Sequence, residues 1–215
     1  MIEFPDPSLA NDEGLLAMGG DLKPATLLAA YGQGIFPWYA EKQPVLWWSP
    51  DPRMVLFPLE FHCSRRLARR MRQGIYRLSW DESFERVINT CADIPRAGEA
   101  GTWILPEMKQ AYYRMHKLGH AHSVEVWRGD VLVGGLYGVL VKRVFFAESM
   151  FSRKIDASKM ALAMLCERAV REQWLLIDCQ FHTEHLQSLG AREVSRDDFM
   201  KWIRIEKKDD NEGEL

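Results

Sequence analysis

The chain has 215 residues, of which 47% are apolar and 27% are charged, and its formal net charge is −2. This composition is typical of a globular protein with one large domain or two unequal ones. No apolar run reaches the roughly 18 residues of a membrane-spanning helix, and the first residues lack the features of a signal peptide. We therefore expect a cytoplasmic protein with no membrane partner. Four scattered cysteines without a C-x-x-C pair fit reduced thiols better than disulfides.

The first part of the chain, residues 1–58, is rich in Pro, Gly and Trp and contains one short helical pattern, Lys23 to Tyr31. Its prolines permit only short extended pieces. We expect a small N-terminal domain over residues 1–58, docked on a larger domain over residues 59–215. The acidic end of the chain, about 206–215, has the composition of a disordered tail.

The larger part alternates helices and strands. The order of helices, an antiparallel meander, a long helix and a further central strand predicts an α+β fold, with a central mixed sheet flanked by helices. It resembles the GNAT acyltransferase core, although a fold-level analogy does not license acetyl-CoA chemistry. Helices are expected at Ser64–Gly74, after Asp81, and at Pro106–Leu118, Ala157–Glu172, Thr183–Leu189 and Asp197–Ile205, and strands at Ile75–Trp80, His122–Arg128, Val131–Leu140, Val144–Glu148 and Trp174–Asp178.

One predicted helix is unusually basic. Leu67 and Met71 form its apolar stripe, and no acid lies among the arginines on the rest of its surface. Such arginines are usually a solvated helix face, but five without an acid favour contact with phosphates. The candidates are Arg65, Arg66, Arg69, Arg70 and Arg72.

Three polar residues end predicted strands. Asp178 and Gln180 lie two positions apart and therefore on the same side of their strand. From periodicity alone, Asp178 is more simply a helix cap, and Glu148 an ordinary carboxylate at a strand end. The histidines around residues 116–122 lack a fourth ligand at a suitable spacing, so we expect no metal.

Nine sequence motifs, which span nearly the whole chain, carry a family resemblance. In order they are GGDL (19–22), GIFPWY (34–39), LWWSPDPR (46–53), GTWI (101–104), GHAHSVEVW (119–127), LVGGLYGV (132–139), FAESMFSR (146–153), ASK (157–159) and LIDCQ (176–180). Together they resemble the leucyl/phenylalanyl-tRNA–protein transferase family. The resemblance implies a monomeric enzyme that moves Leu, Phe or Met from aminoacyl-tRNA to the N-terminal Arg or Lys of a protein, creating an N-degron. Aminoacyl-tRNA is then a substrate, and no cofactor is expected.

The resemblance also implies roles for individual residues. Amine attack on an activated ester needs positioning and a deprotonated amine. Asp178 and Gln180 match the catalytic pair that orients or deprotonates this amine, and Glu148 helps to hold it. Trp38 and Trp103 match aromatics that stack on the terminal adenosine of the tRNA. The arginine helix would bind the phosphates of the tRNA. Other implied site residues are Tyr31 and Tyr112, the pocket residues Leu136, Phe145, Met150, Leu162, Leu165 and Ile177, and Ala147, where the family often has glycine.

Two other functions are consistent with parts of the sequence. An acetyl-CoA-dependent GNAT N-acyltransferase usually has a glycine-bearing pyrophosphate loop at a helix start, whereas residues 151–159 contain no glycine. A non-catalytic tRNA-binding adaptor would explain the arginines and tryptophans. It would leave Glu148, Asp178 and Gln180 without a purpose.

Overall fold

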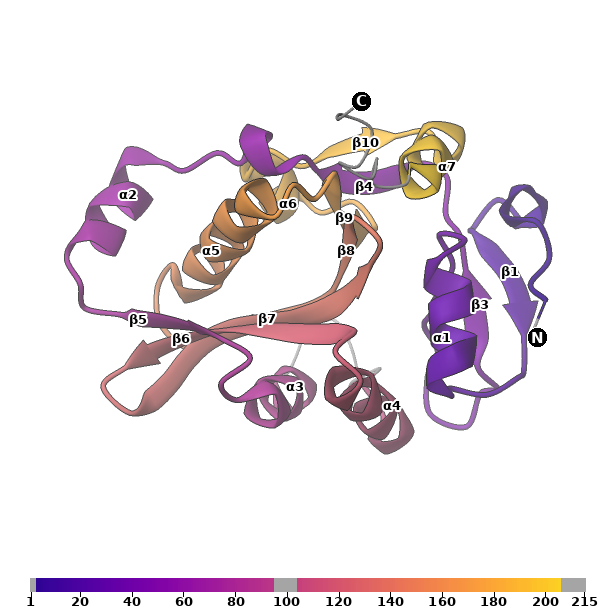
Figure 1. Ribbon diagram of the computed structural model, residues 1–215, viewed down its shortest axis with the longest axis horizontal. Helices are drawn as coiled ribbons and strands as arrows, with labels where there is room; N and C mark the ends of the chain where they lie inside the picture. Colours follow the sequence, from indigo (N-terminus) through magenta and orange to yellow (C-terminus); the bar gives the residue numbers. More distant parts are fainter. Residues whose placement is uncertain (1–2, 95–103, 206–215) are drawn as a thin grey trace, which may run out of the picture.

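The structure is a computed structural model that describes residues 3–94 and 104–205. Its large sheet has seven strands in the order β10-β4-β9-β8-β7-β6-β5; β8 and β9 are parallel, and every other neighbouring pair is antiparallel. This mixed sheet with its flanking helices confirms the predicted α+β class (Figure 1). The strands are Arg53–Leu56 (β4), Arg77–Trp80 (β5), Ala121–Arg128 (β6), Val131–Val141 (β7), Val144–Ser152 (β8), Leu176–Gln180 (β9) and Arg192–Val194 (β10).

Helices cover both faces of this sheet. One long helix, α5, packs on one face, and α3 and α4 pack on the other (Figure 1). Among the described residues, no helix is both long and apolar enough to cross a lipid bilayer. The helices are Pro24–Tyr31 (α1), Arg65–Arg72 (α2), Phe84–Asp93 (α3), Pro106–Lys117 (α4), Ala157–Arg171 (α5), Glu184–Ser188 (α6) and Arg196–Arg204 (α7), with 3-10 turns at Pro7–Leu9 and Pro58–Glu60.

A second, smaller sheet lies beside α1 near the N-terminus (Figure 1). It has the order β1-β3-β2, from Leu15–Met18, Leu46–Trp48 and Phe36–Pro37 respectively. The strand β4 precedes Pro58 in the chain but pairs with β9 and β10 in the large sheet. The domain boundary at Pro58 stays a prediction, as does the tail at 206–215, which lies outside the described residues.

Two strands near the predicted site differ from the sequence expectation. β8 continues past Glu148 to Ser152 because residues 149–152 pair with β7. β9 begins at Leu176 rather than Trp174, because the Trp174 amide still donates to Ala169 at the end of α5. The motif FAESMFSR, expected to leave its strand at Glu148, is therefore strand throughout its first seven residues, and LIDCQ is strand to its last.

The contact between α5 and the sheet depends on small residues. Ala157 and Ala161 share a buried helix face with Leu165, at the i, i+4, i+8 spacing. Below the first of them lies Gly134 of β7, where an added Cβ would be 2.5 Å from the Ala157 Cβ. This close approach brings the start of α5 next to the strands that form the candidate site.

Candidate active site

A cavity of about 570 Å³ opens between the middle of β8 and the end of β9. The parallel pairing of the two strands ends at Phe146 and Asp178, although both strands continue. Pockets of this size with a mostly apolar wall and a few polar groups are typical ligand sites. The wall is formed by Phe36, Pro37, Trp38, Leu136, Ala147, Glu148, Ser149, Met150, Leu162, Cys179, Gln180, Phe181, Thr183, His185 and Leu186.

A β-bulge presents Glu148 to this cavity. Opposite neighbours on β7 and β8 are Tyr137 with Ser149 and Gly138 with Ala147, so Glu148 has no partner on β7. A bulge of this kind re-aims a side chain next to a site. Glycine is required at 138, because an added Cβ would lie 2.2 Å from the backbone oxygen of Phe146.

Two buried tyrosines hold the Glu148 carboxyl group from behind. The Tyr31 hydroxyl donates to Oε1 at 2.6 Å, the Tyr112 hydroxyl donates to Oε2 at 2.7 Å, and the two hydroxyl oxygens are 2.7 Å apart. Tyr31 and Tyr112 are fully buried, so they act through Glu148 rather than line the cavity.

Glu148 is a weaker acid than an ordinary glutamate, mainly because it is buried. Burial raises the pKa of this carboxyl group, the two tyrosine hydrogen bonds lower it, and the charges of Asp178 and Arg53 have smaller, opposite effects; together they bring the pKa to about 7. A carboxyl group with a pKa near neutrality can exchange a proton at physiological pH. Glu148 is thus the titratable group in the cavity best suited to hold an amine.

Asp178 lies behind the cavity wall and is 0% exposed. Its two carboxylate oxygens accept hydrogen bonds from Arg53: Nε donates to Oδ1 at 2.8 Å and Nη2 to Oδ2 at 2.6 Å. Arg53 is also 0% exposed. The sequence analysis did not identify Arg53 as a site residue. A signal was available: Arg53 directly precedes the apolar run Met-Val-Leu-Phe, and a charge in a central strand needs a partner.

Gln180 reaches the cavity from the last position of β9. Its backbone is left-handed, with φ of 58°, and its backbone N–H donates a hydrogen bond to Asp178 Oδ1 at 3.0 Å. The side-chain Nε2 is buried and has no hydrogen-bond partner among the described residues. This orphan donor beside Glu148 in the cavity wall is suited to a polar ligand group.

The predicted apolar pocket divides into wall and core. Four of the residues that the resemblance implies line the cavity: Leu136, Ala147, Met150 and Leu162. The other three predicted members are 0% exposed and lie in the hydrophobic core behind it; they are Phe145, Leu165 and Ile177. Four other apolar residues complete the wall. No periodicity indicated them, because they come from separate strands, a loop and helix α6: Phe36, Cys179, Phe181 and Leu186.

Trp38 lies at the cavity with 37% of its surface exposed. Its ring packs against Trp48 at 5.4 Å and against Phe181 at the same centroid distance. An exposed, supported indole is suited to stacking on a base. The second predicted stacking residue, Trp103, lies outside the described residues.

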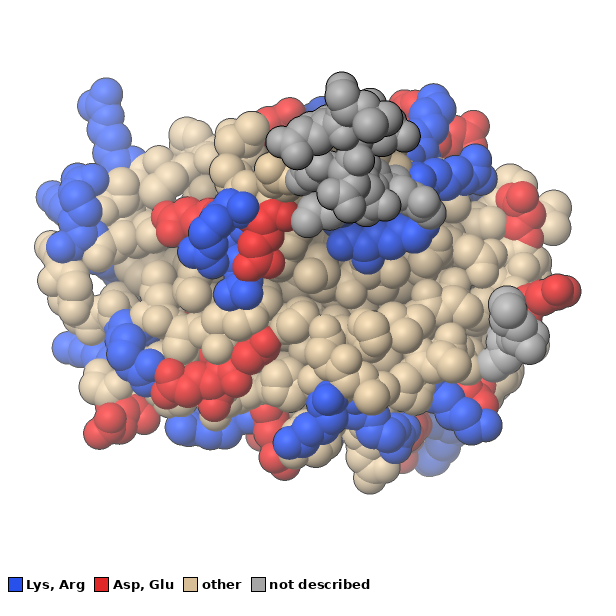
Figure 2. Space-filling view, viewed as in Figure 1, with Lys and Arg blue, Asp and Glu red and all other residues tan. Residues whose placement is uncertain are grey.

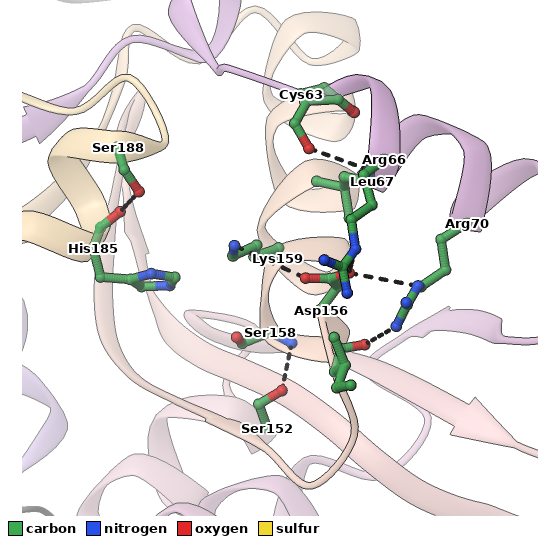
Figure 3. Close-up of polar contacts among 12 residues, drawn as sticks. Cys63, Arg66, Leu67, Arg70, Ser152, Asp156, Ser158, Lys159, His185 and Ser188 are labelled. Carbon is green, nitrogen blue, oxygen red and sulfur yellow. Dashed lines mark hydrogen bonds and ion pairs between the residues drawn. The ribbon is translucent and has the colours of Figure 1, made fainter.

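The arginine helix α2 has two different faces. Arg66 and Arg70 point to Asp156 at the start of α5, with nitrogen–oxygen distances of 4.0 and 3.5 Å, and Arg70 also donates to the Ile155 carbonyl oxygen (Figure 3). Basic side chains gather at the end of the molecule where α2 lies (Figure 2). The outer stripe, spaced i, i+4, i+7 and exposed, is Arg65, Arg69 and Arg72.

Within the described residues, no three His, Cys, Asp or Glu side chains are arranged to hold a metal ion. The histidines of the predicted helix end and strand start have other contacts. His122 Nδ1 is 2.6 Å from an Asp81 carboxylate oxygen, and His116 Nδ1 is 2.8 Å from the Ala121 carbonyl oxygen.

Comparison with known proteins identifies the family of this chain. Two family models match: the leucyl/phenylalanyl-tRNA protein transferase over residues 55–204, and the N-terminal domain of that family over residues 20–51. A leucyl/phenylalanyl-tRNA–protein transferase from Anaeromyxobacter sp. (strain Fw109-5) is 55% identical over 199 residues, 93% of this chain and 85% of that protein. One from Syntrophobacter fumaroxidans is 56% identical over 92% of this chain and 84% of that protein.

Among solved structures, a GCN5-related N-acetyltransferase from Kribbella flavida matches distantly, with a TM-score of 0.42 and 9% identity over 80% of this chain and 61% of that one. The sequence relatives are far closer, and each family model covers a part of the chain that contributes to the cavity. The chain belongs to the leucyl/phenylalanyl-tRNA protein transferase family.

Proposed function

We propose that this protein moves Leu, Phe or Met from aminoacyl-tRNA to the N-terminal Arg or Lys of a protein, and so creates an N-degron, in the cytoplasm where charged tRNA is made. The observation that carries the proposal is the apolar cavity with Glu148 and Gln180 in its wall. The apolar part is suited to the side chain of the donor amino acid, and Trp38 is placed to stack on the terminal base.

The reaction needs little beyond positioning. The acceptor amine attacks the ester carbonyl, the C–N bond forms, the bond to the ribose oxygen breaks, and one proton passes from the amine to that oxygen. Ionised Glu148 accepts a hydrogen bond from the amine, and Gln180 orients it. No cofactor takes part in this scheme.

The start of α5 supports aminoacyl-tRNA over coenzyme A as donor. A pyrophosphate would need free amides and positive charge at this helix start. Here the residue before the helix is Asp156, whose carboxylate already pairs with Arg66, Arg70 and Lys159. A second negative group at that position would be repelled.

The direct test is a transfer reaction. Purified protein is mixed with leucyl-tRNA and a peptide beginning with Arg, and the mass of the peptide is measured; an N-acetylated copy of the peptide and acetyl-CoA are run in parallel. Addition of leucine only to the free Arg peptide is the expected result. If folded protein transfers none of Leu, Phe and Met, the proposal is wrong, and acetylation instead would identify a GNAT N-acyltransferase.

The donor pocket makes a testable distinction between Met150 and Phe145. Met150 lines the cavity, so Met150→Ala enlarges it and is expected to shift the preference for Phe over Leu by about 10-fold, the effect of roughly one methylene. Phe145 is buried and stacks on Trp174 at 5.5 Å. Phe145→Ala is expected to lower the free energy of unfolding by about 3–5 kcal/mol.

The measurements are competition between leucyl- and phenylalanyl-tRNA, and denaturant unfolding. An unchanged donor preference in Met150→Ala, together with weaker tRNA binding, would contradict the assignment of the cavity to the donor side chain.

The outer stripe of α2 predicts the salt dependence of tRNA binding. Replacing Arg65, Arg69 and Arg72 together with Gln is expected to reduce the slope of log K against log salt concentration by about 3, since each phosphate contact adds roughly 0.9. Arg70→Gln is the control, because Arg70 contacts Asp156 within the protein. Binding at several salt concentrations measures both slopes. An equal reduction of this slope in the triple variant and in Arg70→Gln would contradict the division of α2 into two faces.

A further inference from the structure

We propose that Arg53 is a positioning residue for aminoacyl transfer: it anchors Asp178 as a carboxylate, and Asp178 in turn holds Gln180 in the cavity wall. This inference rests on the proposed function. It makes Asp178 an orienting acceptor rather than the base that removes the proton from the amine. The three residues form a chain of contacts that starts in β4 and ends at the cavity.

Arg53 is held in place from several sides. Besides its two hydrogen bonds to Asp178, its guanidinium carbon lies 4.8 Å from the ring centroid of Phe36 and 4.6 Å from that of Phe199. Rings at this distance stabilise a buried cation. Phe199 comes from α7, which can approach because Gly34 has no side chain; a Cβ there would lie 3.0 Å from the Phe199 ring.

The oxygens of Asp178 are already occupied. Oδ1 accepts from Arg53 Nε and from the Gln180 amide, and Oδ2 accepts from Arg53 Nη2. Protonating either oxygen would leave a fully buried guanidinium without its counter-charge, which is strongly unfavourable. Asp178 is also absent from the cavity wall, whereas Gln180 is part of it. Asp178 is therefore poorly placed to take a proton from the substrate, and well placed to hold Gln180.

Gln180 needs such a fixed neighbour. A non-glycine residue in the left-handed region costs on the order of 1 kcal/mol, and φ at Gln180 is 58°. The hydrogen bond from its amide to Asp178 Oδ1 stabilises this conformation. Without Arg53 the Asp178 carboxylate is no longer fixed as the acceptor of the Gln180 backbone N–H, and the Gln180 side chain is then no longer held in position in the cavity wall. Misplacement by about 1 Å at a reacting centre costs about 100-fold in rate.

The test compares charged and neutral pairs at the same two positions. Arg53→Gln and Asp178→Asn are each expected to lower kcat by about 100-fold, and Arg53→Lys, which keeps one charged contact, by about 10-fold. The double variant Arg53→Gln with Asp178→Asn restores a neutral hydrogen-bonded pair. We expect its kcat to recover to within about 10-fold of wild type, with the pH profile of the wild type.

Arg143→Gln is the matched control. Arg143 also makes two hydrogen bonds to one partner, the Gln173 carbonyl oxygen, and is expected to leave kcat unchanged. Circular dichroism and tRNA affinity are measured for every variant. Because Arg53→Lys retains the charge, it reports on positioning even if a neutral single variant fails to fold.

Three outcomes would overturn the inference. A double variant that folds yet stays as inactive as Asp178→Asn alone would show that a carboxylate is required as the base. A changed pH profile in the double variant would lead to the same conclusion. Full activity of both Arg53→Lys and Arg53→Gln would show that Arg53 positions nothing. Failure of wild-type protein to transfer any amino acid is a different result, and it would refute the proposed function instead.

Discussion

Glu148→Gln is expected to lower the rate of leucine transfer by about 100-fold at pH 7.5, since loss of one positioned acid or base typically costs 10²–10⁴-fold. Gln keeps the shape, its oxygen accepts from one tyrosine hydroxyl and its amide nitrogen donates to the other, but it has no negative charge with which to hold an amine. The measurement is single-turnover transfer to a peptide beginning with Arg. Gln187→Ala, a change in α6 outside the cavity wall, serves as the control.

The pH profile separates Glu148 from the amine of the acceptor. Burial raises the pKa of Glu148 to about 7, so the active, ionised form gains population as the pH rises through 7. An α-amine loses its proton at about 7.7–8. Wild type should therefore show two rising limbs in its pH–rate profile, and Glu148→Gln only the one from the amine. Two limbs in the variant would contradict the assignment.

The same group makes stability depend on pH. Its folded pKa of about 7 lies above the ordinary value of 4.5, so the folded state binds more protons between these two pH values. The contribution of protonated Glu148 to stability is complete below pH 4.5 and is lost as the pH rises to 7. Wild type should lose stability relative to Glu148→Gln across this window, as measured by urea unfolding at each pH.

Asp178→Ala is expected to lower the free energy of unfolding by about 3–5 kcal/mol, the usual cost of removing one partner of a buried ion pair. Both side chains of the pair are 0% exposed, and truncation leaves the Arg53 guanidinium without a counter-charge. Denaturant unfolding followed by tryptophan fluorescence measures the change. Loss of activity in this variant alone therefore does not identify a catalytic base.

Removing the whole pair provides the control. In Arg53→Met with Asp178→Leu no charge remains buried, and most of the lost stability is expected to return. Activity should stay low, because the Gln180 amide no longer has its acceptor. If the double variant is no more stable than Asp178→Ala, the cost comes from lost packing rather than from an unpaired charge.

Much of the fold follows from local patterns. Alternation predicts the strand that is β6, the turn at residues 128–130 predicts the start of β7, and capping residues such as Ser64 mark the helix starts. These signals depend only on neighbours along the chain. The family motifs indicated Glu148, Gln180 and four pocket residues, and in the folded protein all six line one cavity. Periodicity alone did not identify them, because a strand-end carboxylate is ordinary in any protein.

The sequence by itself determined the fold class and the family. Only the tertiary structure decided that Asp178 is sealed against Arg53, that Phe145 belongs to the core, and that Arg70 points to Asp156. The reason is physical. Burial and ion pairing depend on residues far apart in the chain, here 125 positions for Arg53 and Asp178, and no local period contains that information.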